Sequence, residues 1–419
     1  MKVIVYEDSK WINLVPLSLI KCVFELRCGF FSMIDRLLPC LPESEKGLWV
    51  RDYMAPLAGK KYGMPVNDTS FFLDDLLIVN GRWLKTDGEI ISPREEKAVK
   101  SGQEMLYAFI KKETVRRFWQ GNFDEFLMSI SGNVKPEEAS GTILEYPWQI
   151  IHHNPKAIET DFLQAGKNGT GGGFSEKAAV TGDETKVFIA EKARVHPFAV
   201  IDTQAGPVYV EKGAEIFPFA RVEGPCYIGS NTHIMPGANI REGCSFGEVC
   251  KVGGEVEESI FHSYANKYHD GFIGHSYIGE FVNLGAMTTN SDLKNDYTNV
   301  TVHVNGTPVD TQDMKVGCFI GDHTKTSIGT LFNTGTSAGI MCNITAGNVL
   351  PKYFPSFSWY INGSYMKGFG LEMMLATAKT AMARRKRTLS AEEESAVRHV
   401  YEMTSSERRE FIRKSRMRK

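Results

Sequence analysis

The residues best suited to chemistry are a histidine, a lysine and two asparagines in the second half of the chain. Residues 266–275 read NKYHDGFIGH, and Asn283 and Asn290 follow a little further on. A histidine such as His269 can act as a general base near neutral pH, because its unperturbed pKa lies close to that range. Asparagine amides can hold sugar hydroxyls, and Lys267 could pair with a phosphate. A lone histidine would favour a structural role, whereas this cluster predicts a functional site around His269.

A six-residue period surrounds this stretch and indicates the element that must position it. Aliphatic residues recur at that interval from Ile189 to Ile201 and from Val210 to Ile240, and small residues keep a second, offset register. This period is typical of a parallel β-helix, in which short strands point an aliphatic residue inward and turn at a small one. Ordinary antiparallel strands would drift off a strict interval of six within two turns. The period continues less regularly to Ile344, but residues 293–314 lose it and predict a loop or extra hairpin ejected from the coil.

Changes in composition and in hydrophobic pattern divide the chain into four parts. Residues 1–164 alternate strands, at 3–6 and 76–79, with an apolar segment at 30–38 and a helical stretch from 93 to about 128, which predicts an α/β domain. Residues 165–182 are rich in glycine and are predicted to be a linker. Residues 183–362 hold the β-helix, and residues 363–419 form a helical tail. That tail is basic, and a solvated helical face is favoured over an anionic partner.

Composition excludes several classes of function. The chain has 48 Lys+Arg against 50 Asp+Glu, and this near-neutral balance argues against binding to nucleic acid or to a membrane surface. No apolar run of about 18 residues could span a bilayer. The start, MKVIVYEDSKW, lacks the regions of a signal peptide, and the 8 cysteines are scattered without CxxC pairs, which is typical of reduced thiols. A cytoplasmic protein is therefore expected.

Several motifs resemble a known family. They are PLSLIKCVFELRCG (16–29), LIVNGRW (77–83), YPW (146–148), NKYHDGFIG (266–274), VNLGAMTTNSDLKN (282–295), GDHTKTSIGTLFNTGT (321–336) and FPSFSW (354–359). The segment from Glu255 to Asn290 resembles the acetyltransferase domain of the bifunctional N-acetylglucosamine-1-phosphate uridylyltransferase/glucosamine-1-phosphate acetyltransferases. Nearly the whole chain is similar to their divergent branch, typical of Bacteroidetes-like lineages and described as sugar nucleotidyltransferases. The resemblance implies a left-handed β-helix that works as a homotrimer.

The resemblance also assigns roles on the β-helix. His269 matches the family's base, which would deprotonate the amino group of glucosamine-1-phosphate as it attacks the thioester of acetyl-CoA. Asn283 and Asn290 match amides that hold the sugar. Two positions depart from the pattern: Phe272 replaces a sugar-contacting Tyr, and Glu257 replaces a phosphate-binding Lys. The cations that could replace that lysine are Lys267, Arg241 and Lys325, and residues 321–326 are expected to line the acyl-donor cleft between subunits.

The first domain resembles the same family's nucleotidyltransferase fold, but its phosphate-binding loop has a different sequence. Classical members place a glycine-rich loop and an Arg after the first strand, whereas this chain has no glycine before Gly29. Arg27 is the best phosphate-binding candidate. Asn80 and Arg82 lie just past a strand end, where open α/β sheets bind ligands. Mg²⁺ accompanying UTP would be held by a carboxylate, for which the candidates are Asp8 and Asp52.

Three functions remain open from the sequence. The first is a transferase of UDP-N-acetylglucosamine-type nucleotide-sugar synthesis for the cell envelope, by acetyl transfer, uridylyl transfer or both. The second is a non-catalytic trimeric sugar-binding scaffold. For the α/β domain taken by itself, the alternative to catalysis is a degenerate domain retained for packing or binding. The third is a zinc hydratase of the γ-carbonic-anhydrase type with His262, His269 and His275 as ligands, although their spacings of seven and six are not those of that family.

Overall fold

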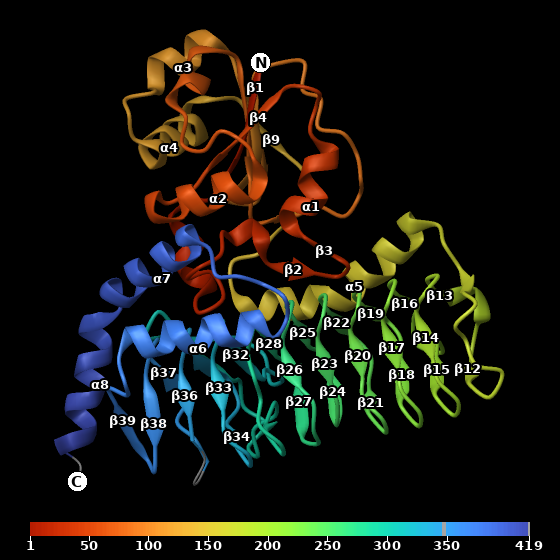
Figure 1. Ribbon diagram of the computed structural model, residues 1–419. Coiled ribbons are helices and arrows are strands. Elements are labelled where there is room, and N and C mark those ends of the chain that lie inside the picture. Colours follow the sequence, from red (N-terminus) through yellow and green to blue (C-terminus); the bar gives the residue numbers. More distant parts are fainter. Residues whose placement is uncertain (346–348, 418–419) are drawn as a thin grey trace.

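An α/β domain stands on a long parallel β-solenoid in the computed structural model, which describes residues 1–345 and 349–417 (Figure 1). The α/β domain has a six-stranded sheet in the order β4-β1-β5-β8-β7-β9. Its elements are β1 (Lys2–Tyr6), α1 (Met33–Leu37), β4 (Glu45–Trp49), α2 (Ala55–Tyr62), β5 (Leu76–Asn80), β7 (Lys97–Ser101), β8 (Glu104–Ile110), α3 (Lys112–Phe118), α4 (Phe123–Asn133) and β9 (Pro136–Glu138). Two small pairs add β2 (Arg27–Cys28) with β3 (Phe31–Ser32) and β6 (Trp83–Leu84) with β10 (Thr142–Ile143).

The central strands of this sheet are buried on both sides. Val3 and Val5 face one apolar cluster, whereas Ile4 and Tyr6 face another. Such strands read as continuous apolar runs, which is why the strands at 3–6 and 76–79 were predictable. The helix predicted to start at residue 93 is wrong in its first half, because β7 and β8 form an antiparallel hairpin there and helix begins only at α3.

The solenoid winds three parallel faces around an apolar interior. The first face contains β11 (Gly169–Thr170), β13 (Val187–Ile189), β16 (Val208–Val210), β19 (Cys226–Ile228), β22 (Cys244–Phe246), β25 (Ile260–Phe261), β28 (Tyr277–Ile278), β32 (Cys318–Ile320), β35 (Thr336–Ala338) and β37 (Tyr353–Phe354). The second contains β14 (Arg194–Val195), β17 (Glu215–Ile216), β20 (His233–Ile234), β23 (Lys251–Val252), β26 (Asn266–Lys267), β33 (Lys325–Thr326), β36 (Asn343–Ile344) and β38 (Trp359–Ile361), to which β39 (Ser364–Met366) adds an antiparallel strand. The third contains β12 (Ala179–Thr181), β15 (Val200–Asp202), β18 (Arg221–Glu223), β21 (Asn239–Ile240), β24 (Glu255–Glu257), β27 (Phe272–Gly274), β29 (Thr289–Asn290) and β34 (Leu331–Phe332).

The periodic aliphatic residues fill the interior as predicted. Val210, Ile216 and Val222, one from each face, are fully buried and share one apolar cluster. The ejected hairpin is also confirmed: β30 (Thr301–Val304) and β31 (Thr307–Asp310) pair antiparallel outside the coil. The period therefore specified both the coil and its interruption.

The glycine-dense segment predicted as a linker is instead the beginning of the solenoid. β11 pairs in parallel with β13, and β12 pairs with β15. A Cβ atom at Gly173 would lie 1.9 Å from the carbonyl oxygen of Ala193. The glycines thus allow adjacent backbones to approach closely.

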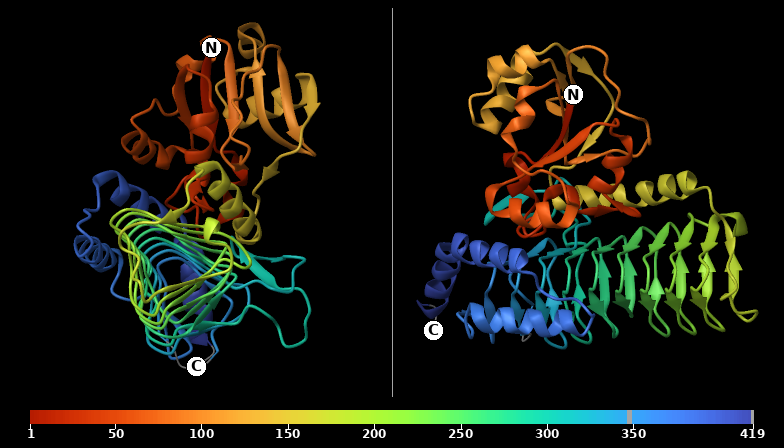
Figure 2. Two further views of the ribbon diagram at one scale, coloured as in Figure 1. Left: turned by 90° about the vertical axis from the view of Figure 1, so that its right-hand side faces the viewer. Right: turned by 45° about the horizontal axis from the view of Figure 1, so that its top comes forward.

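Helix α5 (Pro147–Ala165) connects the two domains and lies along the first face of the solenoid (Figure 2). Asn154 accepts hydrogen bonds from the Gly29 amide (2.7 Å) and the Ser245 hydroxyl (3.0 Å), and its Nδ2 donates to the Gly243 carbonyl (2.8 Å). One buried amide therefore ties the β2–β3 hairpin of the α/β domain to the solenoid.

The C-terminal segment is helical, as predicted, with α6 (Leu371–Ala383), α7 (Ala391–Met403) and α8 (Ser405–Met417). Helix α7 packs on α2. Leu375 of α6, Val397 of α7 and Val302 of the ejected hairpin all join the apolar cluster of the α/β domain. These contacts place the hairpin and the tail against the chain's own first domain.

None of the described helices is long and apolar enough to cross a membrane. All eight cysteines are unpaired and buried.

Candidate functional site

His269 lies on the corner between the second and third faces of the solenoid. Its side chain is exposed, and its ring meets Tyr268 edge to face at 5.0 Å between centroids. Within the described residues no hydrogen bond occupies either ring nitrogen of His269. Both nitrogens are therefore available to a ligand.

Asn283 stands beside this corner on the next coil. It is exposed, and its Oδ1 accepts a hydrogen bond from Asn266 Nδ2 (2.8 Å). Asn266, Asn283 and Lys325 are register neighbours along the second face. The structure thus brings an exposed amide next to the strand that leads to His269.

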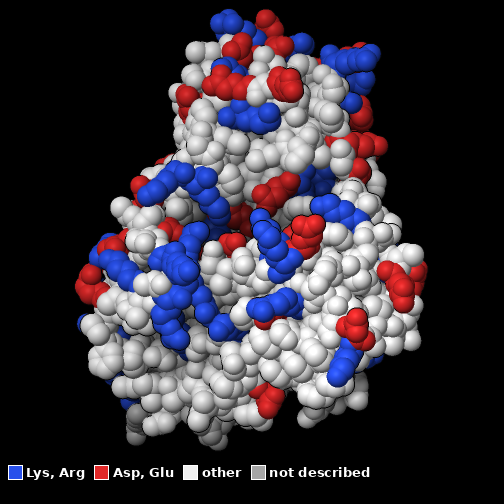
Figure 3. Space-filling view, turned by 45° about the vertical axis from the view of Figure 1, so that its right-hand side comes forward, with Lys and Arg blue, Asp and Glu red and all other residues white. Residues whose placement is uncertain are grey.

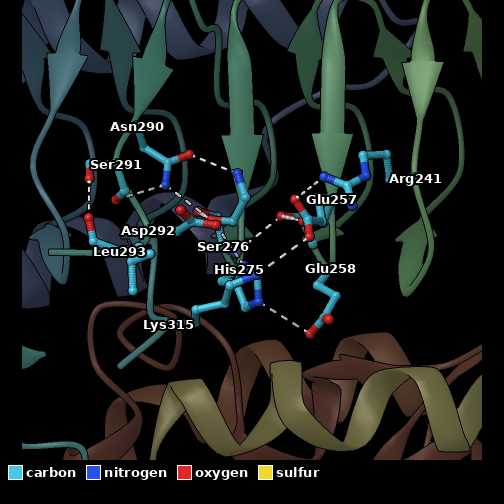
Figure 4. Close-up of polar contacts among 12 residues, drawn as sticks. Arg241, Glu257, Glu258, His275, Ser276, Asn290, Ser291, Asp292, Leu293 and Lys315 are labelled. Atoms are coloured by element: carbon cyan, nitrogen blue, oxygen red, sulfur yellow. Dashed lines mark hydrogen bonds and ion pairs between the residues drawn. The ribbon is translucent and has the colours of Figure 1, made fainter. Parts of the chain in front are cut away.

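Asn290 is buried and fully engaged. Its Oδ1 accepts from the Gly274 amide (2.9 Å), and its Nδ2 donates to the carbonyls of Gly274 (3.0 Å) and Ser291 (3.1 Å), as Figure 4 shows. These bonds fix β27 against the following coil. They favour a structural role over the sugar-binding role expected from the resemblance.

Lys267 points into the solenoid. It occupies the interior position aligned with Val252, and only 1 % of the residue is exposed. Its Nζ donates to the carbonyls of Gly253 (2.7 Å) and His269 (3.1 Å), so it supports the corner that carries His269. Burial lowers the pKa of Lys267 to about 8, with partial opposition from Asp270. This lysine cannot meet a phosphate on the surface while it makes these contacts.

Replacing Lys267 with methionine is expected to stabilise the protein near pH 7 by about 1–3 kcal/mol, because the variant no longer buries an unpaired ammonium. Below pH 8 the lysine is protonated in both states, so the native state carries the full cost. As the pH rises from about 8 towards the unfolded value of 10.5, the native state loses its proton first and the difference between the two proteins closes. Urea denaturation of both proteins at several pH values measures this; a variant less stable at pH 7, or a gap independent of pH, would contradict it.

Arg241 is held by carboxylates on the corner between the third and first faces. Its guanidinium lies 2.8 Å from Glu257 and 3.9 Å from Glu255 (Figure 4). Glu257 also lies 3.8 Å from Lys315. The glutamate that departs from the family pattern therefore neutralises the nearby cations.

Lys325 is covered by helix α6. Together with Met374 and Thr377 of that helix it lines a small cavity, and its Nζ donates to the His323 carbonyl (3.0 Å). Burial lowers its pKa to about 8. The stretch expected to line a cleft between subunits is thus covered here by the chain's own helix.

The three histidines of the zinc alternative lie on three different corners of one coil. His262 follows β25, His269 follows β26 and His275 follows β27. His262 pairs with Glu280 at 3.0 Å, and His275 lies between Asp292 (2.8 Å) and Glu258 (3.4 Å). Among the described residues no group of three or more His, Cys, Asp or Glu side chains could hold a metal ion. This geometry does not support the hydratase.

In the α/β domain the carboxyl ends of β1 and β5 carry a closed polar network. Arg82 is fully buried and donates to both oxygens of Asp8 (3.1 and 2.7 Å) and to Glu104 (2.8 Å). Asn80 accepts from the Arg82 amide (2.9 Å) and donates to the Met105 carbonyl (3.1 Å). The two residues lie at the predicted edge of the sheet, but their polar atoms are occupied by protein groups.

Asp52 lies at the same edge, just beyond β4, and is exposed. The only described contact of its side chain is a hydrogen bond accepted from Asn67 Nδ2 at 3.5 Å. Of the two carboxylates expected to hold Mg²⁺, Asp52 is thus the free one, whereas Asp8 is paired with Arg82.

Arg27 lies elsewhere, at the interface with the solenoid. Its amide donates to the Tyr277 hydroxyl (2.9 Å), and its guanidinium donates to the Phe30 carbonyl and lies over the Tyr227 ring. These contacts separate it from the strand ends where a nucleotide would be expected.

Arg51 was missed from the sequence and lies directly after β4. Its guanidinium stacks on Trp11 at 4.0 Å and donates to the carbonyls of Ser18 (2.5 Å) and Lys21 (2.6 Å). Its Nη1 is buried without a hydrogen-bond partner. A cation following a parallel strand was the available signal.

The α/β domain is similar to known proteins. Residues 3–168 match the family model described as sugar nucleotidyl transferase. A bifunctional sugar-1-phosphate nucleotidylyltransferase/acetyltransferase of Sulfurisphaera tokodaii is 35% identical over 104 residues, which cover 24% of this chain and 26% of that protein. The match thus spans about a quarter of the length of the relative. These matches support a transferase.

Solved structures of UDP-N-acetylglucosamine acyltransferases are also similar. The Francisella novicida protein has 12% identity and a TM-score of 0.21, and the alignment covers 55% of this chain and 87% of that one. The Campylobacter jejuni protein has 13% identity and a TM-score of 0.19, with coverages of 53% and 94%.

Proposed function

We propose that the protein is a bifunctional transferase of nucleotide-sugar synthesis, with acetyl transfer from acetyl-CoA to glucosamine-1-phosphate on the solenoid and uridylyl transfer from UTP in the α/β domain. The observation that carries the first activity is His269, an exposed imidazole without a protein partner next to the exposed amide of Asn283. The family match of residues 3–168 supports the second.

The acetyl transfer follows from ordinary acid–base chemistry. The substrate amine attacks the thioester carbonyl, a C–N bond forms and the C–S bond breaks. His269 takes the proton that the amine loses, and the departing thiolate takes up a proton to leave as a thiol. Asn283 would hold a sugar hydroxyl through its exposed amide.

His269 is exposed on its corner of the solenoid, and a second copy of the chain would supply the other wall of the site. In a homotrimer built around the flat faces of the solenoid, a closed threefold ring would supply the same wall to every copy.

For uridylyl transfer the residues present fit a magnesium nucleotide in part. Arg51 Nη1 has no hydrogen-bond partner, although it is buried and the Nε of the same guanidinium lies 3.5 Å from Glu7, and Asp52 offers an exposed carboxylate. Mg²⁺ is commonly held by one or two carboxylates together with substrate phosphates, and when bound it would neutralise their charge. Arg82 would hold Asp8 in place at the edge of the sheet.

The two activities can be tested separately on the purified full-length protein. Thiol release with acetyl-CoA and glucosamine-1-phosphate measures the first, and pyrophosphate release with UTP, Mg²⁺ and N-acetylglucosamine-1-phosphate measures the second. Glucosamine-6-phosphate is the control acceptor. Absence of both activities would overturn the proposal and favour the sugar-binding scaffold, whereas release with other sugar phosphates only would correct the substrate.

A binding-only α/β domain is the second candidate, and one observation favours it. The network of Arg82, Asp8 and Glu104 leaves few polar groups free at the strand ends. Acetyl transfer without pyrophosphate release would identify this case.

A further inference from the structure

A turn of four consecutive cations follows helix α6. The residues are Arg384, Arg385, Lys386 and Arg387, and Lys386 has a left-handed backbone (φ 57°). The amides of Arg385 (2.8 Å) and Arg387 (3.0 Å) both donate to the Met382 carbonyl. The turn is therefore compact, and its charges are held close together.

This basic turn faces the second face of the solenoid near Lys251. Lys251 points outward from β23, and its Nζ lies 5.6 Å from the centre of the Tyr268 ring. Burial, and then the charges of Arg385 and Arg384, lower the pKa of Lys251. Arg387 lies over the Tyr264 ring at 5.5 Å. Lys and Arg side chains gather on this side of the molecule below the α/β domain (Figure 3).

The cations of this cluster are unpaired. In the described part of the chain, neither Lys251 nor any residue of the basic turn forms an ion pair with a carboxylate. By contrast, Lys379 and Arg398 of the neighbouring helices pair with Glu394, at 2.7 Å in each case. Like charges gathered without counter-ions repel one another, and an anion bound between them would remove that repulsion.

The cluster lies next to the proposed base. Lys251 is the register partner of Asn266, which begins the strand leading to His269. Tyr268 contacts both Lys251 and His269. The three cations expected from the sequence to hold a phosphate are engaged elsewhere: Lys267 inside the coil, Arg241 with glutamates and Lys325 under α6.

We infer that Lys251 and the basic turn 384–387 form a phosphate-binding site that holds a phosphate ester of an acetyl-transfer substrate beside His269. This inference rests on the proposed function for the identity of the ligand. The phosphate could belong to the sugar phosphate or to coenzyme A, because both carry the group that the cluster would bind.

The test compares a double variant, Lys251→Ala with Arg385→Ala, with a control that removes two exposed cations from the first coils, Lys177→Ala with Lys212→Ala. Isothermal titration of the full-length proteins with inorganic phosphate, glucosamine-1-phosphate and coenzyme A measures affinity at low and high salt. We expect the double variant to lose about tenfold or more in affinity for one phosphate ester, with a weaker dependence on salt, and the control to match the wild type. The ester affected identifies the source of the phosphate.

Unchanged affinity of the double variant for all three ligands would overturn the site. Failure of the proposed function is seen separately, because binding does not require turnover. If the wild type releases no thiol yet binds a phosphate ester through Lys251 and Arg385, the phosphate-binding site is supported and the proposed acetyl transfer is rejected. If the wild type and the double variant release thiol at the same rate and with the same KM values, acetyl transfer is supported and the phosphate-binding site is rejected.

Discussion

Replacing His269 with alanine is expected to lower kcat for acetyl transfer by about 10²–10⁴-fold, the usual contribution of a general base. The ring nitrogens of His269 have no protein partners in the described residues, so the substitution removes little stability. Because the histidine acts on the amine as it attacks, we expect KM for glucosamine-1-phosphate to change much less than kcat. Thiol release under saturating acetyl-CoA measures both constants.

The matched control is His196→Ala. His196 begins the equivalent corner of an earlier coil, where it stacks on Phe217 and contacts Glu215 at 3.2 Å. This variant should keep full activity. If His269→Ala retains wild-type kcat while folding normally, another group takes the proton and the assignment of the base is wrong.

Replacing Asp161 with alanine is expected to destabilise the protein by about 3–5 kcal/mol, the range observed when one partner of a buried ion pair is removed. Asp161 on α5 accepts from Arg36 Nη2 (2.6 Å) and from the Phe30 amide (2.8 Å), and both charged side chains are almost completely buried. Burial raises the pKa of Asp161 more than Arg36 lowers it. The intact pair is therefore worth little by itself, but an unpaired buried guanidinium is costly. Urea denaturation measures the change in the free energy of unfolding.

Two further variants separate this explanation from a general defect of the helix. Glu159→Ala removes a more exposed carboxylate from the same helix, one that pairs with exposed Lys156 at 3.0 Å, and should change stability by less than about 1 kcal/mol. Combining Asp161→Leu with Arg36→Leu removes both charges and should recover part of the loss. A double variant less stable than Asp161→Ala would show that the charges themselves hold the interface.

Much of the solenoid could be predicted because its core repeats a local rule. The same rule explains two residues that were interpreted differently. Lys267 falls six residues after Phe261 and six before Ile273, and Asn290 falls six after Leu284, so the period itself places both inside the coil. Their polar side chains suggested a role at the surface. In the folded chain, however, both side chains are buried and form hydrogen bonds with backbone groups. His269 and Asn283 fall outside the interior register and are exposed.

The contacts that determine the roles of Arg82, Lys251 and the basic turn could not be predicted from the sequence. Arg82 and Asp8 are separated by 74 positions, and only the folded sheet brings them together. Likewise, the basic turn and Lys251 lie more than a hundred residues apart, and the turn gave no signal beyond its charge. In the α/β domain the hairpin of β7 and β8 replaced an expected helix because pairing with β5 decided the conformation.

The way the solenoid is attached to the α/β domain limits how its length can evolve. A stack of repeats normally gains or loses a unit at little cost, since each unit contacts only its neighbours. Here α5 leads from the domain to the first coils, and α7 returns to the domain after the last. An added coil between those attachments would shift one against the other by about 4.8 Å, the spacing of adjacent strands. The two attachments to the α/β domain thus constrain the number of coils between them, whereas a side hairpin such as β30–β31 adds residues without adding a coil.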